Sequence, residues 1–345
     1  MLTPARRASA EELRTRLGIS RDTAEQQAAL GALPEAASLA ADQIEEALAR
    51  SERDLSTAPR WTWAQLDRLT GPMLPGDLWI VGALMANGKT SFLLSQLDAW
   101  HGASVPVLYL PLEMDPPDLR RRWAAWRLGY NPIAVARNEW GQLEPGAKDR
   151  LAAMVVQLGG SPSVQFPGDK RVSLDKLRQW AAWGVREIGA RVIVIDHLHR
   201  MQFAPDQYRI AVTEAMREIK DLAREHQVVV LAAAQLNQHT DDPLDRYFPP
   251  TLRRLKESAG IAEEADVVLM LSRRLTRPLG KQEMLEVRCG LASERDYAAP
   301  GVMAVTCRKH RLADAMAGDR TVTLHVRHGR VEDDDPGDAY EPQEG

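Results

Sequence analysis

Residues 79–94 read Trp-Ile-Val-Gly-Ala-Leu-Met-Ala-Asn-Gly-Lys-Thr-Ser-Phe-Leu-Leu, and this stretch decides the fold class. An apolar strand from Leu78 to Val81 runs into a short loop that ends in Gly88-Lys89-Thr90, and an apolar-periodic helix follows directly. A strand, a loop and a helix in this order present backbone N–H groups and a helix N-terminus to a chain of phosphates. The stretch therefore predicts a phosphate-binding loop.

One position of this loop departs from the usual pattern Gly-x-x-x-x-Gly-Lys-[Ser/Thr], because Ala83 stands at the first glycine. Gly-Lys-Thr alone also occurs by chance, and the flanking strand and helix are what favour a nucleotide site. Lys89 would reach the β- and γ-phosphates, and the Thr90 hydroxyl would bind Mg²⁺. The residues expected at the nucleotide are Ala83, Leu84, Met85, Ala86, Asn87, Gly88, Lys89, Thr90 and Ser91. The sequence thus predicts a nucleoside triphosphatase.

The composition is that of an ordinary globular protein. The chain has 345 residues, of which 44% are hydrophobic and 27% charged, with a net charge of −4. No apolar run has the length that a bilayer requires, and the N-terminus lacks the apolar core of a signal peptide, so we expect a cytoplasmic protein without a membrane partner. Cys289 and Cys307 are the two cysteines, which excludes a disulfide framework and a cysteine-based zinc site. Because the net charge is negative, a protein of this composition that binds nucleic acid must concentrate its positive charge in one region.

Three segments are expected along the chain. Residues 1–60 are predicted to form a helical extension, in which Ala41 to Asp54 is an amphipathic linker helix that docks on a neighbouring subunit. The alternative for this extension is a frayed, solvated segment. Residues 61–332 are predicted to form one α/β domain, and residues 333–345 an acidic disordered tail.

The α/β domain is expected to contain a mostly parallel sheet flanked by helices. The first strands are continuous apolar runs, which indicates burial on both faces, and the later ones alternate and fit antiparallel additions. The expected strands are Leu78–Gly82, Val105–Pro111, Arg191–Asp196, Val228–Gln235, Asp266–Leu271, Met284–Val287, Val302–Cys307 and Thr321–Val326. The expected helices are Thr90–Trp100, one beginning at Asp115-Pro116-Pro117, one running from Ser173 to Glu187, and Thr213–His226.

Polar residues follow three of the apolar strands. Asp196 closes Arg-Val-Ile-Val-Ile-Asp, and we expect it to hold the metal from a strand next to the phosphate-loop strand, although such a residue can also cap a helix. Glu113 is placed to deprotonate an attacking water, and Gln235 to sense the γ-phosphate. Each residue singly can be a surface cap. Because carboxyl ends of parallel strands meet at one edge, the three residues are expected to converge there.

With these motifs in place, the chain resembles the RecA-type motor domain of DnaB-type replicative helicases. The resemblance covers roughly residues 60–332, and the family also commonly has alanine at the position of Ala83. Its motifs occur in family order: L-D-R-L-T-G-P-M-L-P-G-D-L (66–78), G-A-L-M-A-N-G-K-T-S-F (82–92), L-E-M (112–114), V-I-D-H-L-H-R-M (194–201), A-Q-L-N (234–237), L-K-E-S-A-G-I-A-E-E-A-D (255–266) and R-K-H-R (308–311).

The resemblance implies a role for each site residue. Lys89 and Thr90 would bind phosphate and Mg²⁺, Glu113 would be the catalytic base, Asp196 a carboxylate that holds the metal indirectly, and Gln235 the γ-phosphate sensor. It also implies that Lys309 and Arg311 reach the nucleotide of a neighbouring subunit. A guanidinium supplied in trans stabilises transition-state charge. The alternative for Arg-Lys-His-Arg is a solvated basic strand end.

DNA contacts are also implied by the resemblance. The family's channel loops map to Lys256-Glu257-Ser258-Ala259-Gly260 and to residues 202–212, where Arg209 is the cation, while Arg253 and Arg254 add charge nearby. Few aromatic residues are available there, so we expect the protein to track the phosphate backbone. Arg273 is expected to approach the base of the nucleotide.

The leading hypothesis is an ATP-dependent, Mg²⁺-requiring hexameric helicase that translocates 5′ to 3′ on single-stranded DNA in replication, with a primase or a helicase loader as a further partner. The alternatives are a RecA-like recombination or repair ATPase, forming rings or filaments on DNA, and a nucleotide-switched scaffold or loader. Two features depart from the family: its N-terminal collar domain is absent or reduced to residues 1–60, and segment 276–299 is longer than expected.

Overall fold

The computed structural model describes residues 55–169, 172–202, 208–237, 242–289, 291–312 and 320–333. The linker helix expected at residues 41–54 and the acidic tail from residue 334 lie outside the described residues. From Ala58 onward the chain forms one compact unit. Within the described ranges, no helix has both the length and the apolar character needed to cross a bilayer.

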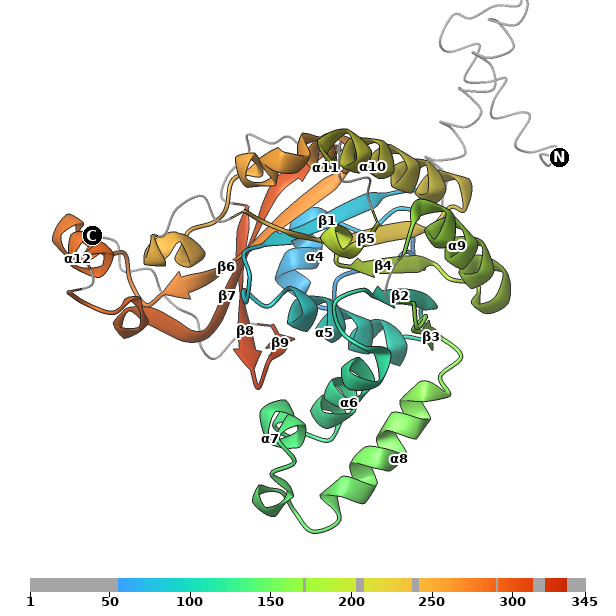
Figure 1. Cartoon of the computed structure of the whole chain (residues 1–345), viewed down its shortest axis with the longest axis horizontal. Helices are drawn as coiled ribbons and strands as arrows, with labels where there is room; N and C mark the ends of the chain where they lie inside the picture. Colours follow the sequence, from blue (N-terminus) through green and yellow to red (C-terminus); the bar gives the residue numbers. More distant parts are fainter. Residues whose placement is uncertain are drawn as a thin grey trace, which may run out of the picture. The chain divides into compact units, whose positions relative to one another are not determined.

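A single sheet organises this unit, and nine strands are seen in the described part of the chain in the order β3-β2-β4-β5-β1-β6-β7-β8-β9 (Figure 1). The strands from β3 to β6 pair in parallel, and β7, β8 and β9 add an antiparallel edge. The predicted α/β class and the antiparallel additions are confirmed. The strand bounds are β1 Leu78–Ala83, β2 Val107–Pro111, β3 Val164–Gln165, β4 Val192–Asp196, β5 Val229–Gln235, β6 Val267–Leu275, β7 Ala298–His310, β8 Thr321–Arg327 and β9 Arg330–Glu332.

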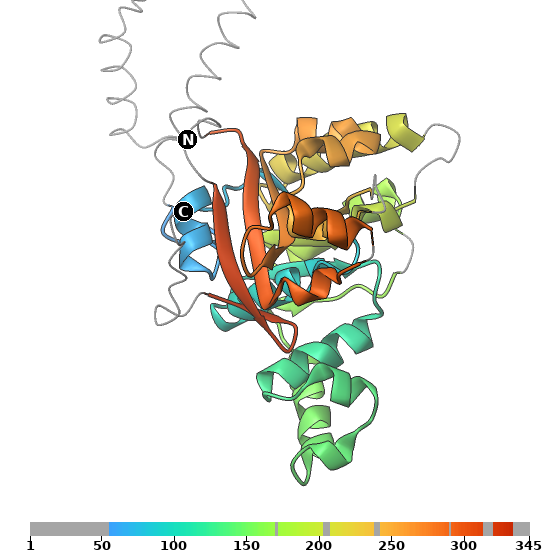
Figure 2. The ribbon, with the colours of Figure 1, turned by 90° about the vertical axis from the view of Figure 1, so that its left-hand side faces the viewer.

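Helices cover both faces of the sheet (Figures 1 and 2). The α-helices are α4 Ala64–Thr70, α5 Lys89–Gly102, α6 Pro116–Arg127, α7 Pro132–Ala136, α8 Ala147–Gly159, α9 Leu174–Ile188, α10 Tyr208–Glu225, α11 Ala259–Glu264 and α12 Lys281–Arg288. Short 3-10 helices are η1 Trp140–Gln142, η2 Leu198–Arg200, η4 Pro243–Tyr247, η5 Leu252–Ser258 and η6 Glu294–Asp296. As predicted, prolines begin α6, and the Ser173 hydroxyl accepts a hydrogen bond from Lys176 N at the start of α9.

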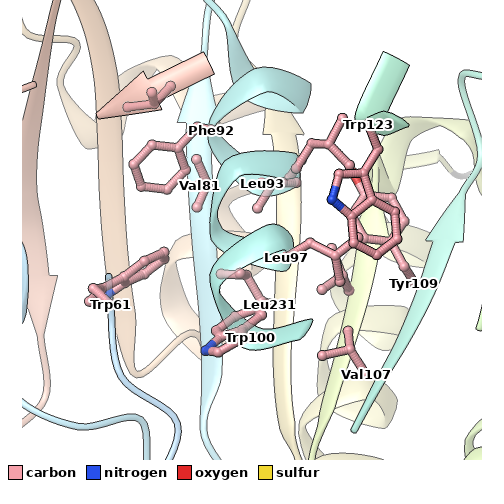
Figure 3. Packing of buried hydrophobic residues seen from close by; sticks show 14 of the residues in the cluster. Trp61, Val81, Phe92, Leu93, Leu97, Trp100, Val107, Tyr109, Trp123 and Leu231 are labelled. Atoms are coloured by element: carbon pink, nitrogen blue, oxygen red, sulfur yellow. The ribbon is translucent and has the colours of Figure 1, made fainter. Parts of the chain in front are cut away.

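Alternate side chains of the central strands divide between two hydrophobic cores. On β1, Trp79 and Val81 join the core beneath α4, α5, α6 and α8, whereas Leu78 and Ile80 join the core beneath α9, α10 and α11. This alternation is what a strand covered on both faces requires. Figure 3 shows the first core, in which Leu93 and Leu97 of α5 lie over the sheet. The two cores hold β1 rigidly, and β1 positions the loop that follows it.

The strand predicted at Met284–Val287 is wrong, because these residues lie within α12. A short apolar run does not distinguish a strand from a helix. The side chain of Glu283 accepts a hydrogen bond from Gly280 N at 2.8 Å, which closes the first turn of the helix. Val287 is buried with Leu244 and Tyr247 in a small third cluster. The long segment at 276–299 is therefore α12 and η6, joined to η4 by apolar packing.

Candidate active site

The phosphate loop has the strand–loop–helix form that the sequence predicts. Ala83 is the last residue of β1, and α5 begins at Lys89. Gly88 has a φ of 84°, and a Cβ added there would lie 2.8 Å from Cε of Met303. Glycine is therefore favoured at this position by the left-handed backbone, and a larger residue would also displace the end of the Met303 side chain. The N-terminus of α5 is directed to the carboxyl edge of the parallel strands, where a phosphate can bind.

Lys89 is buried at this edge, with 8% of its surface exposed. Its ammonium donates to the carbonyl oxygens of Ala83 at 3.3 Å and Leu84 at 3.5 Å. Burial lowers its pKa, while the charges of Asp196 and Glu113 act in the opposite direction. A cation held among two carboxylates and loop carbonyls is suited to move onto a phosphate oxygen.

Asp196 lies at the bottom of the site with 3% of its surface exposed. Its Oδ2 accepts a 2.8 Å hydrogen bond from the Tyr109 hydroxyl, and its Oδ1 has no hydrogen bond of normal geometry within the described residues. Burial raises the pKa of this carboxyl, and hydrogen bonding from Tyr109 and the nearby Thr90 hydroxyl opposes the rise. A buried carboxylate with one unpartnered oxygen and a threonine hydroxyl nearby fits the oxygen ligands of Mg²⁺ or of its bound water.

The expectation that Asp196 ends a strand next to the phosphate-loop strand is wrong. β5 lies between β4 and β1, and it is Gln235, the last residue of β5, that pairs with Ala83. Asp196 and Gln235 nevertheless reach the same edge of the sheet, because all these strands are parallel. The backbone N–H of Gln235 donates to Nδ1 of His199 at 3.3 Å, and its side chain is partly exposed.

Glu113 follows β2 and reaches the same edge. Its backbone N donates to the Asp196 carbonyl at 3.2 Å, and its carboxylate is 44% exposed. Oε2 lies 3.5 Å from Nε2 of His197, whose pKa burial lowers to about 4, with the charges of His199 and Lys89 acting in the same direction. His197 is therefore neutral near pH 7, and it does not neutralise Glu113. A cavity of about 570 Å³ opens beside Glu113 and is also lined by Arg200.

Further residues at the site carry no sequence signal of their own. Tyr109 is a buried strand residue, and nothing in its spacing predicts its contact with Asp196. Arg122 of α6 donates to Oγ of Ser91 at 2.6 Å, directly beside the phosphate loop. Arg273, expected at the base, donates to the Ala86 carbonyl at 3.2 Å, so it contacts the phosphate loop itself.

Lys309 and Arg311 lie far from the phosphate loop of their own chain. His310, between them, pairs with Val267 at the start of β6, whereas Ala83 pairs with Leu271. At about 3.3 Å per residue, that register places the two ends roughly 13 Å apart along the sheet. Arg311 forms a 3.0 Å ion pair with Asp266, and Lys309 donates to the last carbonyls of α11, those of Ala262 and Glu263, at 2.7 and 2.8 Å.

The residues expected at DNA are only partly described. The side chains of Arg209 and of Lys256, Glu257, Ser258 and Ala259 lie outside the described part. Gly260 is buried, and a Cβ there would lie 2.5 Å from Oγ1 of Thr213, so this glycine permits close packing against α10. Arg253 is exposed, whereas Arg254 is bound by both nitrogens to the carboxylate of Asp245. Arg254 is therefore engaged within the protein and is not retained as a DNA contact.

The sequence is similar to those of known proteins. The family model described as "DnaB-like helicase C terminal domain" matches residues 61–315. The "Replicative DNA helicase DnaB" of Leifsonia xyli is 27% identical over 247 residues, which cover 70% of this chain and 52% of that protein. The chain thus spans about half the length of the curated relatives it matches.

Two solved structures have similar folds. One, described as an ATPase domain, superposes with a TM-score of 0.66 at 20% identity, over 88% of this chain and 99% of that one. "The Structure Of A DnaB-Like Replicative Helicase And Its Interactions With Primase" gives a TM-score of 0.66 at 20% identity, over 94% of this chain and 74% of that one.

Proposed function

This chain belongs to the family of DnaB-like helicase C-terminal domains, and from that premise we propose that it is an ATP-driven ring motor on single-stranded DNA. The proposal depends on one observation: the residues expected to bind and hydrolyse the triphosphate lie far from the arginine expected to stabilise the transition state. The phosphate loop and Glu113 lie at one edge of the sheet, and Arg311 lies at the other. Arg311 therefore lies away from the phosphate loop of its own protomer, and we assign it to the pocket of a neighbouring protomer.

Within the pocket, each of these residues has a separate role. Lys89 and the N–H groups at the start of α5 hold the phosphates, and Thr90 and Asp196 hold Mg²⁺. When bound, Mg²⁺ offsets the negative charge of the β- and γ-phosphates. Glu113 accepts the proton of the attacking water, because its carboxylate is accessible and faces a neutral imidazole. Gln235 senses the γ-phosphate from the strand next to β1.

Between protomers, Lys309 and Arg311 complete the site of a neighbour. An arginine supplied in trans is worth about 10³–10⁵ in rate, and it ties hydrolysis to assembly. We propose a hexameric ring, in which Lys256 to Gly260 and Arg253 follow the phosphates of DNA threaded through the channel. Movement from 5′ to 3′ and a role in replication are part of the proposal.

A primase or a helicase loader is proposed as a further partner. A solved relative is described with its primase interactions, and the present chain is similar in fold to that protein. Retention of a purified primase on the immobilised ring, and its absence from a control matrix, would support this part of the proposal.

Unwinding of a forked DNA provides the direct test. We expect ATP-dependent strand separation when the fork carries a free 5′ tail, and much less with a 3′ tail alone. Electron microscopy with a non-hydrolysable ATP analogue should show closed rings. Continuous filaments would favour a recombination ATPase, and rings that neither unwind DNA nor turn over ATP would favour a scaffold; either result overturns the motor.

A further inference from the structure

The phosphate loop touches a turn that lies outside the site described above. Asn87, with 4% of its surface exposed, donates from Nδ2 to the backbone carbonyl of Arg246 in η4 at 3.4 Å. Its Oδ1 is buried and has no hydrogen-bond partner in the described ranges. Arg273 donates to the carbonyl of Ala86, the preceding residue of the same loop. A displacement of η4 therefore reaches the loop backbone through a buried amide.

The same turn is held to the next one by a buried ion pair. The Asp245 carboxylate of η4 binds both terminal nitrogens of Arg254 in η5. The side chains are only 10% and 19% exposed, so solvent screens the pair weakly. A bidentate pair also fixes the relative orientation of its partners. The ion pair therefore links η4 directly to η5.

The chain between these turns is also fixed. Arg308 of β7 donates to the carbonyl oxygens of Pro249 and Pro250, each at 2.8 Å. η5 continues through Lys256 to Ser258, and α11 follows without a break. The segment proposed to meet DNA is thus connected by partly buried polar contacts to the segment that is proposed to hold the phosphates.

We propose that Asp245 is a positioning residue that couples single-stranded DNA on η5 to the phosphate loop. Strain from DNA on η5 passes through Arg254 to Asp245, from η4 to Asn87, and so to the loop that orients the triphosphate. Asp245 is not among the residues that we propose to bind nucleotide or DNA. The inference depends on the proposed function, because it assigns a signal to the DNA that η5 is proposed to hold.

Asp245→Asn tests the link, because the amide keeps the shape and loses the charge that binds Arg254. We expect DNA-stimulated ATP turnover to fall about three- to tenfold. Turnover without DNA and the Kd for single-stranded DNA should stay within about twofold, because both sites are intact. Asp242→Asn is the matched control: it changes the same residue type at the N-cap of η4 and removes the Arg288 ion pair, but it leaves the Asp245–Arg254 pair and the Asn87 contact in place.

Two further variants keep the test decisive. Asp245→Glu retains the carboxylate and should recover at least part of the stimulation. Should Asp245→Asn not fold, Arg254→Lys replaces it with the same expected loss, since lysine keeps the charge without the bidentate contact. Normal stimulation in Asp245→Asn, or equal loss in the Asp242→Asn control, would overturn the coupling. Absence of DNA stimulation in the unaltered protein would instead refute the proposed motor, so the two failures are distinguishable.

Discussion

The Tyr109 hydroxyl donates a 2.8 Å hydrogen bond to Oδ2 of Asp196 and leaves Oδ1 of that carboxylate without a hydrogen bond in the described residues. The strand register makes this contact possible, because Tyr109 pairs with Val194, two residues before Asp196, on the neighbouring strand. One oxygen of the carboxylate is thereby fixed by the protein, and the other is available for a metal or its water. The contact fixes the orientation of the carboxylate.

Tyr109→Phe should lower the affinity of the site for Mg²⁺, while ATP still binds. Loss of the orienting donor frees the Asp196 carboxylate to rotate, and such changes typically cost about 10–100-fold in metal affinity. The measurement is the Mg²⁺ concentration for half-maximal ATP turnover. Tyr130→Phe is the control, because Tyr130 also donates a 2.8 Å hydrogen bond to a carboxylate, that of Glu144, in another part of the fold. Identical Mg²⁺ curves for the Tyr109 variant and the unaltered protein would contradict the role.

Glu113→Gln should bind ATP normally and lose its DNA-stimulated turnover. The amide keeps the size of the side chain but cannot accept the proton of water, and a general base contributes about 10²–10⁴-fold. Binding of a fluorescent ATP analogue and steady-state phosphate release measure the two effects separately. Asp118→Asn, in the same cavity beside Glu113, is the matched control and should keep most activity. Near-normal turnover in the Glu113 variant would refute its assignment as the base.

Lys256→Ala should weaken binding to single-stranded DNA and flatten its salt dependence. Removal of one phosphate contact lowers the slope of log K against log salt by about 0.7. Fluorescence anisotropy at several salt concentrations gives the slope. Lys281→Ala removes an exposed lysine from α12 and should leave the slope unchanged. An unaltered slope in the Lys256 variant would place the DNA elsewhere.

The two cysteines should differ in reactivity in the folded protein. Cys307 lies in β7 and burial raises the pKa of its thiol, whereas Cys289 is exposed. A raised pKa leaves less of the reactive thiolate at neutral pH, and burial also blocks the reagent. Mass spectrometry after brief maleimide treatment should find one adduct, at Cys289, and a second only after unfolding. Rapid labelling of Cys307 in the native protein would contradict the packing of β7.

Sequence patterns were sufficient where one physical cause dominates. The P-loop strand and helix follow from apolar burial and from Gly88, and the strand ends at Asp196 and Gln235 follow from the apolar runs before them. The parallel sheet and its antiparallel edge were predicted for the same reason. Periodicity is local, so it cannot specify which strand lies beside which; hence the insertion of β5 between β1 and β4 was not predicted.

Contacts between distant segments account for the remaining differences. Met284–Val287 is helical because Gly280 and Glu283 close a first turn and Val287 meets η4, neither of which its own apolar run specifies. Arg254 was expected near DNA because of its charge, but its side chain is bound by Asp245, nine positions earlier. Charge in a sequence shows that a cation is present, and only the fold shows whether it is already paired.

Arg311→Ala should abolish hydrolysis, and mixing it with Lys89→Ala protein should restore part of it. Each parent lacks one half of the site: the first keeps the pocket, and the second keeps the cation. Because Arg311 lies at the edge of the sheet opposite to its own phosphate loop, only an interface between the two variants can hold both halves. Loss of an arginine supplied in trans costs about 10³–10⁵ in rate, so even a minority of hybrid interfaces gives turnover well above both parents. Arg295→Ala, an exposed and distant arginine, is the control and should be fully active alone. Since the Asp266 ion pair of Arg311 is partly exposed, its loss should change the unfolding temperature little, which separates a catalytic effect from a structural one. If mixed proteins show only the sum of the parental rates, the cation does not act across the interface and the ring loses its chemical basis.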